Sequence, residues 1–381
     1  MEPQNSSFQS GITFDDVLLL PGYSDFSRSD IDLSTQFSKN IRISIPLVSA
    51  PMDTVTESKL AIELARLGGI GIIHRNLTIE DQASEVREVK SKGLLVGAAI
   101  GASNGFEDRM KALAKAGVDV VVVDSAHGYA KGVIETVKFI KKNYKDIDVV
   151  AGNIATSEGA KALIAAGADG LRVGMGPGAI CTTRIISGMG VPQITAILET
   201  SRAAKKSGVP VIADGGIKYS GDITKALAAG ASTVMMGGYF AQTIESPGKI
   251  ITLKQDELPS RFQKISQMKK DYQFKEYRGM GSIGAMEKGA QIKSEDEFHG
   301  KNYKDRVLVA EGVEGLVPVK GTVSDLVDQA VGGVKSGMYY VGAKNLAELW
   351  KKAKFIQITQ ASLTESHPHD IFVTNPGKNY A

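Results

Sequence analysis

The stretch Ala116-Gly117-Val118-Asp119-Val120-Val121-Val122-Val123-Asp124 contains the signals that decide the fold. An Ala-Gly pair ends a helical pattern, a run of valines of strand length follows, and an acid stands where that run ends. Glycine is common just after a helix, and an immediate strand start gives the short turn that is expected between a helix and a strand. Because Ala-Gly turns recur at Ala166-Gly167 and Ala229-Gly230, the chain repeats a helix–turn–strand unit.

Eight apolar runs alternate with helical patterns between residues 45 and 250. The predicted strands cover residues 46–49, 71–74, 94–100, 118–124, 149–153, 170–174, 209–214 and 233–237. The predicted helices cover residues 57–67, 79–90, 106–116, 131–143, 158–166, 196–207 and 222–229. Such alternation is typical of parallel βαβ units.

Polar residues and glycines gather where the predicted strands end, as in Asp124-Ser125, Asn153 and Asp214-Gly215-Gly216. This distribution predicts an α/β fold, a (β/α)8 TIM barrel, because such barrels hold their functional groups at the carboxyl ends of the strands. A doubly wound open sheet is the alternative, but eight units in series favour closure. We expect one domain over residues 1–381, with the charged, weakly periodic residues 250–320 as an irregular, mobile flap. Residues 323–354 are expected to be helical, with Gly332-Gly333 and Gly342 as interruptions, and to close the ring.

The composition excludes several classes of protein. The chain has 381 residues, of which 43% are hydrophobic, and it has a formal net charge of +3 and one cysteine. A balanced charge gives little drive for binding nucleic acid, and a single cysteine suits a reducing compartment. The longest apolar runs are far short of a membrane span, and residues 1–11 are polar. We therefore expect a cytoplasmic protein with no nucleic-acid or membrane partner.

The single cysteine, Cys181, lies in the glycine-rich stretch GMGPGAICTTR, residues 174–184, which follows a predicted buried strand. A lone cysteine is usually a small buried hydrophobic residue. Glycines, however, let a backbone approach a ligand closely, and a thiol on such a loop, beside two threonines, is placed for covalent chemistry. The sequence therefore favours a nucleophile at this position.

Two further loops predict a phosphate site, although their glycines could also serve only as tight turns. The loop Asp214-Gly215-Gly216-Ile217 leads to a helix start, and Met236-Gly237-Gly238 follows the last predicted strand. Backbone N–H groups of the loops after strands seven and eight commonly bind phosphate in barrels. Asp214 would suit a ribose diol, and Asp124 could bind a second ribose or cap a helix.

Longer motifs carry a family resemblance over almost the whole chain. They are TFDDV (13–17), SAPMDTV (49–55), DSAHG (124–128), the Cys181 stretch with GVPQ (190–193), ADGG (213–216), YRGMGS (277–282) and ESHPHD (365–370). Together they resemble the IMP dehydrogenase/GMP reductase family. Many members carry a regulatory CBS insert, but here the chain runs from Lys90 to Gly93 directly into the next predicted strand. We expect no CBS domain.

The resemblance implies a purine nucleoside monophosphate as substrate and a role for each matching residue. Cys181 would attack C2 of the purine, and Thr183 with Glu311 would transfer protons. The other residues expected at the substrate are Ser49, Gly216, Gly237 and Gly238 for the phosphate, Asp214 for the ribose, and Met52, Met280 and Gly281 for the base, with Tyr277 and Glu311 close by.

The resemblance also implies NAD or NADP and a potassium ion. Asp124, Ser125 and Asn153 would face the dinucleotide. Carbonyl oxygens of Gly176, Gly178 and Cys181 would bind potassium, and Glu365, Ser366 and His367 of a neighbouring subunit would complete the site, which suits a hard cation. The family is usually tetrameric, so we expect a homotetramer.

The chain departs from the dehydrogenase pattern in its flap. Dehydrogenases bring an arginine of an Arg-Tyr pair to activate water, but no such pair occurs between Gly281 and Glu311. Residues 295–299 stand there instead, and Arg306 is a weak substitute. Ala179 replaces a usual serine, and Gly238 is similar to the reductase branch. IMP dehydrogenase is the leading hypothesis, GMP reductase is the second, and a catalytically weak nucleotide-binding protein is the third.

Overall fold

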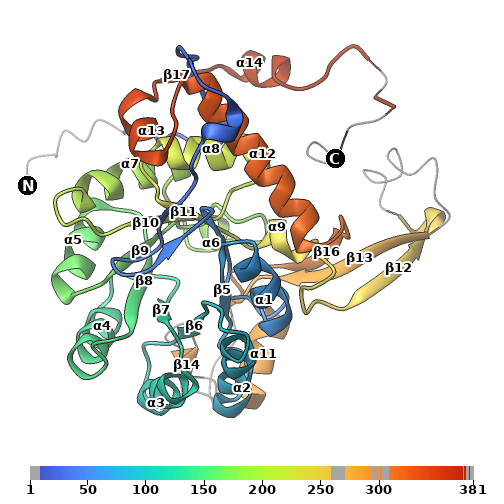
Figure 1. Ribbon diagram of the computed structural model, residues 1–381. Helices are drawn as coiled ribbons and strands as arrows, with labels where there is room; N and C mark the ends of the chain where they lie inside the picture. The colour runs from blue at the N-terminus through green and yellow to red at the C-terminus, as the bar shows by residue number, and fades with distance from the viewer. Residues whose placement is uncertain are drawn as a thin grey trace, which may run out of the picture.

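Eight parallel strands close into a barrel in the order β10-β11-β4-β5-β6-β7-β8-β9 (Figure 1). The computed structural model describes residues 9–258, 271–292, 297–298, 301–302, 309–371, 373–374 and 377. The strands are β4 (Leu47–Ser49), β5 (Ile70–Ile73), β6 (Gly97–Ile100), β7 (Val120–Asp124), β8 (Asp148–Ile154), β9 (Gly170–Val173), β10 (Val211–Asp214) and β11 (Thr233–Met236). The predicted closed barrel is confirmed, with all eight predicted strands.

A ring of helices covers the barrel. These are α1 (Ser58–Arg66), α2 (Ile79–Lys90), α3 (Phe106–Ala116), α4 (Lys131–Asn143), α5 (Ser157–Ala166), α7 (Gln193–Ala204), α8 (Ser220–Ala228) and α12 (Val323–Val341). The Ala-Gly turns form as predicted: Gly117 and Gly167 cap α3 and α5 with φ of 84° and 101°. This left-handed conformation favours glycine.

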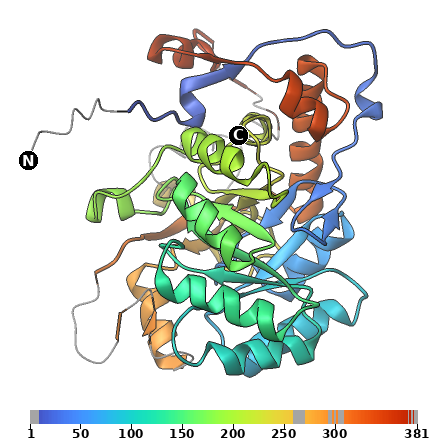
Figure 2. The same ribbon diagram turned by 90° about the vertical axis from the view of Figure 1, so that its left-hand side faces the viewer.

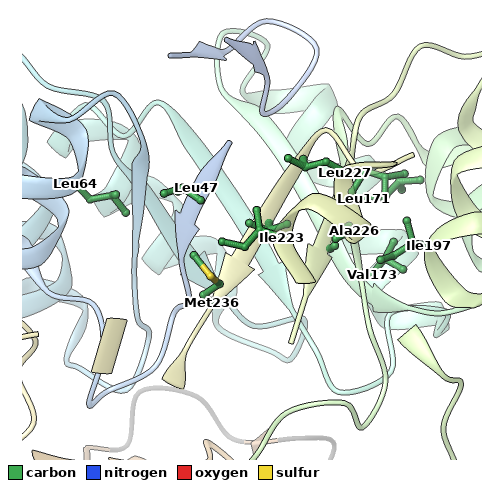
Figure 3. Close-up of a cluster of buried hydrophobic side chains, with 14 of the residues drawn as sticks. Leu47, Leu64, Leu171, Val173, Ile197, Ile223, Ala226, Leu227 and Met236 are labelled. Carbon is green, nitrogen blue, oxygen red and sulfur yellow. The ribbon is translucent and has the colours of Figure 1, made fainter. Parts of the chain in front are cut away.

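The core has two layers, because successive strand residues point to opposite sides. Leu47 and Leu171 pack outward against helix residues such as Ile223 and Ile197 (Figure 3). Val48 belongs to the inner layer that fills the barrel. Each of these side chains is buried, and full burial of such a side chain stabilises the fold by about 1.5–3 kcal/mol.

A hairpin of β2 (Thr35–Gln36) and β3 (Arg42–Ile43) closes the amino-terminal end of the barrel. Phe37, on its turn, is fully buried in the inner layer. Ser38 Oγ donates to Asp148 Oδ2 at 2.5 Å, at the start of β8. The opposite end, where the strands finish, is therefore the end at which a ligand site is expected. We call it the barrel mouth.

The two ends of the described chain meet on one side of the barrel, at the top of both views (Figures 1 and 2). There β1 (Val17–Leu19) pairs antiparallel with β17 (Phe355–Gln357). The neighbouring short elements are η1 (Phe14–Asp16), η2 (Arg28–Asp30), α13 (Leu346–Lys352) and α14 (Gln360–Glu365).

One helix prediction was wrong in detail. α12 runs through Gly332-Gly333 without interruption and ends at Gly342, which has φ of 83°. A helical glycine costs about 1 kcal/mol relative to alanine. Buried residues of α12 such as Val327 and Val334 offset that cost, because α12 packs against α8 and α1.

The described part of residues 250–320 is largely regular, whereas the charged sequence indicated an irregular segment. β12 (Ile250–Lys254), β13 (Asp271–Arg278) and β16 (Glu314–Pro318) form an antiparallel sheet that projects from the barrel (Figure 1). The remaining elements are η3 (Gln255–Glu257), α11 (Ile283–Ile292), β14 (Glu297–Phe298) and β15 (Lys301–Asn302). β12 alternates exposed and half-buried residues, so none of its side chains is fully buried. Within the described residues, no helix has the length and apolar character needed to cross a membrane.

Candidate active site

Cys181 lies at the barrel mouth on the loop that follows β9. Its thiol is half-buried, and Sγ donates to Thr183 Oγ1 at 3.2 Å. The loop turns sharply at Gly174 and Gly176, whose φ values are 152° and 79°. A Cβ at Gly174 would lie 2.1 Å from the carbonyl oxygen of Asp214, so only glycine fits there. The short helix α6 (Thr183–Ile186) begins two residues after the thiol.

A backbone ladder brings Glu311 to this loop. The N–H of Thr182 donates to Glu311 O, and the N–H of Val313 donates to Ile180 O, both at 2.9 Å. On its other side, the N–H of Glu311 donates to Gly281 O at 3.1 Å. Segment 311–313 therefore lies between the Cys181 loop and the YRGMGS segment. Three elements far apart in sequence meet beside one thiol.

A cavity of about 250 Å3 opens beside the loop. Residues 177–179, 215–218 and 235–238 line it, with Phe14, Arg184, Gln193 and Tyr277 among the others. The two loops with the predicted phosphate glycines thus face the same space, as does Gly178. Gly215 and Gly216 have φ of 89° and 79°, which turns the loop around the cavity.

Tyr277 joins the flap strand β13 to this cavity. Its side chain is buried, and a Cβ at Gly237 would lie 2.8 Å from both the Tyr277 hydroxyl and Met52 Sδ. Burial raises the pKa of Tyr277, Asp214 raises it further, and a hydrogen bond from the backbone of Gly238 opposes them. The phenol therefore stays protonated near neutral pH and can donate a hydrogen bond to an anion.

Arg172 connects two predicted ligand residues, and the sequence analysis missed it. This β9 side chain is buried; its Nε donates to Asp214 Oδ2 at 2.9 Å and its Nη1 to Asp124 Oδ1. Burial alone would lower the pKa of Arg172, but the two carboxylates together raise it. The available signal was one charged residue inside the apolar run Gly170-Leu171-Arg172-Val173.

The three residues predicted to face the dinucleotide lie on neighbouring strands. Asn153 Nδ2 donates to Asp214 Oδ2 at 2.8 Å and to Gly174 O at 2.9 Å, so it stands on the Cys181 side of Asp124. Ser125 follows β7, and its Oγ contacts the carbonyl oxygen of His127 at 3.3 Å. The structure therefore brings Asp124 and Asn153 into one network with Asp214.

Ser49 differs from the other predicted phosphate residues in its surroundings. It is fully buried at the end of β4, where its Oγ accepts a hydrogen bond from Thr56 Oγ1 at 2.8 Å. It is not among the residues that line the cavity. Its part in phosphate binding stays a prediction.

The predicted potassium ligands fit a hard cation on the side of the Cys181 loop. Carbonyl oxygens are suitable donors; Gly178 O already accepts from the N–H of Cys181 at 3.0 Å and keeps a second lone pair. In this chain, Glu365 is the last residue of α14, Ser366 and His367 follow it, and the His367 ring lies 6.2 Å from that of Tyr219. Their contact with a neighbouring subunit's loop stays a prediction. Arg306 and residues 295, 296 and 299 lie outside the described residues.

Lys275 anchors the flap sheet to the barrel. Its buried ammonium donates to the carbonyl oxygens of Thr243 at 3.1 Å, Ile244 at 3.3 Å and Ser246. These carbonyls follow the short helix α9 (Gly238–Ala241), which begins at the cavity. Burial lowers the pKa of Lys275 to about 8, nearby Lys59 adds to that effect, and Glu245 opposes it.

We expect Lys275 to make the free energy of unfolding rise with pH from about 8 to its ordinary pKa of 10.5. In that window the unfolded chain holds a proton that the folded chain has released, so stability rises with pH. Lys275→Met should remove this contribution, about 3 kcal/mol over the window. Urea unfolding at both ends of the window measures it, with the exposed Lys161→Met as control. Equal pH dependence in the wild type and Lys275→Met would contradict the assignment.

The closed parallel barrel, with a thiol loop and a glycine-lined cavity at its mouth, defines the protein as an α/β-barrel enzyme. Residues 11–369 match the IMP dehydrogenase / GMP reductase domain, so the chain belongs to this family. It is 44% identical to the inosine-5'-monophosphate dehydrogenase of Cryptosporidium parvum, over 97% of this chain and 98% of that protein. It is 40% identical to that of Aquifex aeolicus, over 98% of each chain. The corresponding enzyme of Borreliella burgdorferi is 42% identical, over 97% of this chain and 99% of that protein.

Proposed function

We propose that this protein is an IMP dehydrogenase, which converts IMP, NAD and water into XMP and NADH. The observation that supports the proposal is the backbone pairing that brings segment 311–313 to the Cys181 loop beside the glycine-lined cavity, where Thr183 Oγ1 lies 3.2 Å from the thiol. Membership of the family and the names of the three relatives support the same reaction.

In the proposed mechanism, the Cys181 thiolate forms a bond to C2 of the purine. NAD, when bound, would supply the acceptor for the hydride that leaves this carbon. A purine thioimidate then remains on Cys181, and water adds to C2 as the carbon–sulfur bond breaks. XMP leaves and the thiolate is regenerated. In this proposal Thr183, whose Oγ1 lies 3.2 Å from Sγ, would pass the proton of this water to Glu311.

The other residues would bind and orient the reactants. Gly216, Gly237, Gly238 and Tyr277 would donate to the phosphate, and Asp214 would accept from the ribose. Met52, Met280 and Gly281 are proposed for the base, Asp124, Ser125 and Asn153 for NAD, and Ser49 for support of the phosphate loop. Potassium held by carbonyl oxygens of Gly176, Gly178 and Cys181 would fix the thiol loop. We propose a homotetramer, with Glu365, Ser366 and His367 as the neighbouring subunit's share of that site.

GMP reductase, which would convert GMP and NADPH into IMP and ammonia, is the second candidate. The absence of an Arg-Tyr pair between Gly281 and Glu311, together with Gly237-Gly238, favours it. Thr183 and Glu311 would serve either reaction. The reductase must protonate the departing ammonia, and the dehydrogenase must activate water, and both steps need a proton-transfer pair. General-base catalysis typically speeds a reaction by about 10²–10⁴-fold. A dehydrogenase without the arginine base should therefore hydrolyse its covalent intermediate more slowly, by up to that factor, than a dehydrogenase that has it.

Two parallel assays test the proposal. The protein is incubated with IMP and NAD, and separately with GMP and NADPH, while the absorbance of the reduced nicotinamide is followed. Appearance of NADH in the first mixture is the expected result. Consumption of NADPH in the second alone would establish the reductase, and binding without turnover in both would establish a nucleotide-binding protein.

A further inference from the structure

A group of four contacts joins the loop after β4 to the end of the flap strand β13 and the residues just after it. Arg278 Nη2 lies 2.5 Å from Asp53 Oδ2, and Arg278 Nε lies 3.1 Å from Asp53 Oδ1. The backbone N–H of Arg278 also donates to Thr54 Oγ1 at 3.3 Å. The backbone N–H of Asp53 contacts Met280 Sδ at 3.4 Å. We call the Asp53–Arg278 ion pair the clasp.

The carboxylate of the clasp is deeply buried yet charged. The Asp53 side chain has no exposed surface, and its Oδ2 also accepts from Asn76 Nδ2 at 2.8 Å. Burial by itself would raise the pKa of Asp53, but Arg278, His74 and Asn76 together lower it. Asn76 Nδ2 donates in addition to Ala285 O at 3.2 Å, so the carboxylate is linked to α11 as well.

The guanidinium is held from the flap side. Glu314 stands opposite Arg278 in the β13–β16 register and raises the pKa of Arg278, after the larger effect of its hydrogen bond to Asp53. Glu314 Oε1 accepts from the N–H of Gly284 at 2.7 Å, near the start of α11. The Arg278 guanidinium therefore has a second carboxylate nearby on the flap side while its planar fork forms the bidentate pair with Asp53.

The clasp lies between two residues that are proposed to hold the purine base. Met52 directly precedes Asp53, and Met280 follows Arg278 by two residues. Met52 Sδ and the Tyr277 hydroxyl approach the same point above Gly237, which places this wall next to the phosphate cavity. Because 225 positions separate Asp53 from Arg278, non-covalent contacts such as the clasp must set the distance between the two methionines.

We propose that Asp53 and Arg278 are positioning residues that fix the separation of Met52 and Met280 and thereby shape the purine-base subsite. The inference rests on the proposed function, because it takes a purine nucleotide as the ligand. Neither residue is assigned a contact with the reacting atoms. A bidentate ion pair with a fully buried carboxylate suits this role, since losing Arg278 leaves the Asp53 charge buried without its counterion.

A double-mutant cycle with two ligands tests the proposal. Dissociation constants for IMP and for ribose 5-phosphate, which lacks the base, are measured in the full-length protein. Arg278→Met should weaken IMP binding by about tenfold and leave ribose 5-phosphate binding within about twofold, because the phosphate loops are untouched. Arg278→Lys should fall between, since a lysine keeps the charge but not the fork. Asp53→Asn combined with Arg278→Met should weaken IMP binding no further than the worse single change.

The controls separate this inference from the proposed function. Arg202→Met, an exposed change on α7, should leave both constants unchanged. Equal weakening of IMP and ribose 5-phosphate by Arg278→Met would overturn the inference, and so would additive effects in the cycle. If Asp53→Asn fails to fold, the dissociation constants of Arg278→Met and Arg278→Lys for IMP and ribose 5-phosphate still test the inference. Failure of the wild type to bind IMP would instead contradict the proposed function, and the cycle would then be run with GMP.

Discussion

Replacing Cys181 with alanine is expected to reduce turnover at least about 10⁴-fold, because no other group would form the covalent bond to the purine. IMP affinity should stay within about threefold of the wild type, since the phosphate and ribose contacts are unchanged. Among the residues that the structure describes, the half-buried thiol makes one side-chain hydrogen bond, to Thr183, so the fold should tolerate the change. Initial rates of nicotinamide reduction and a calorimetric titration with IMP provide the two measurements.

Thr182→Ala is the matched control for this substitution. Thr182 is the next residue, and its side chain makes no cap hydrogen bond to α6, so its truncation should change the rate only a few-fold. Cys181→Ala activity above about one per cent of the wild type would rule out the thiol as nucleophile. Loss of IMP binding in the same variant would show that the loop, and not the chemistry, had been damaged.

The fold could be predicted from local signals that tertiary structure does not override. The Ala116–Asp124 stretch combines a left-handed glycine, a buried valine run and a polar end, and each appears in the structure where the pattern placed it. α2, α3 and α4 have the predicted bounds because their apolar spacing and polar ends agree. The expected helix interruption at Gly332-Gly333 was wrong because the low helix propensity of glycine costs little free energy compared with what the packing of α12 on α8 contributes.

Contacts between segments that are far apart in the chain could not be predicted from the sequence. The motifs identified Cys181, Thr183 and Glu311, but not the antiparallel β-bridge between Cys181 and Gly312 that brings segment 311–313 beside the thiol loop. Lys275 resembles a solvent-facing residue of a charged segment, yet its ammonium is enclosed by three carbonyl groups. Both arrangements depend on where β13 and β16 pack, and composition does not encode that placement.

Among the residues whose contacts could not be predicted from the sequence, Arg172 is the one whose replacement is expected to have the largest effect. Arg172→Met would remove the counterion that Asp124 and Asp214 share at the mouth, although Asp124 would keep Arg75, whose Nε lies 3.7 Å from its Oδ2. Breaking a buried pair is strongly destabilising, and we expect the free energy of unfolding to fall by about 3 kcal/mol. That is the low end of the usual range, because the two carboxylates keep 16% and 14% of their side-chain surface exposed. Nucleotide binding should weaken as well, because Asp214, the proposed ribose ligand, would keep its contact with Asn153 but lose the one with Arg172.

Urea unfolding and IMP titration of Arg172→Met, Arg172→Lys and Arg202→Met measure these effects. Lysine keeps a charge but has a single ammonium, so it should satisfy one carboxylate at a time and restore part of the stability. Arg202 is exposed on α7, and its replacement should change the unfolding free energy by less than about 0.5 kcal/mol. If Arg172→Met were as stable as Arg202→Met, Arg172 would not be the counterion that allows two acids to share the barrel mouth. The proposed proximity of the ribose and dinucleotide sites would then need another explanation.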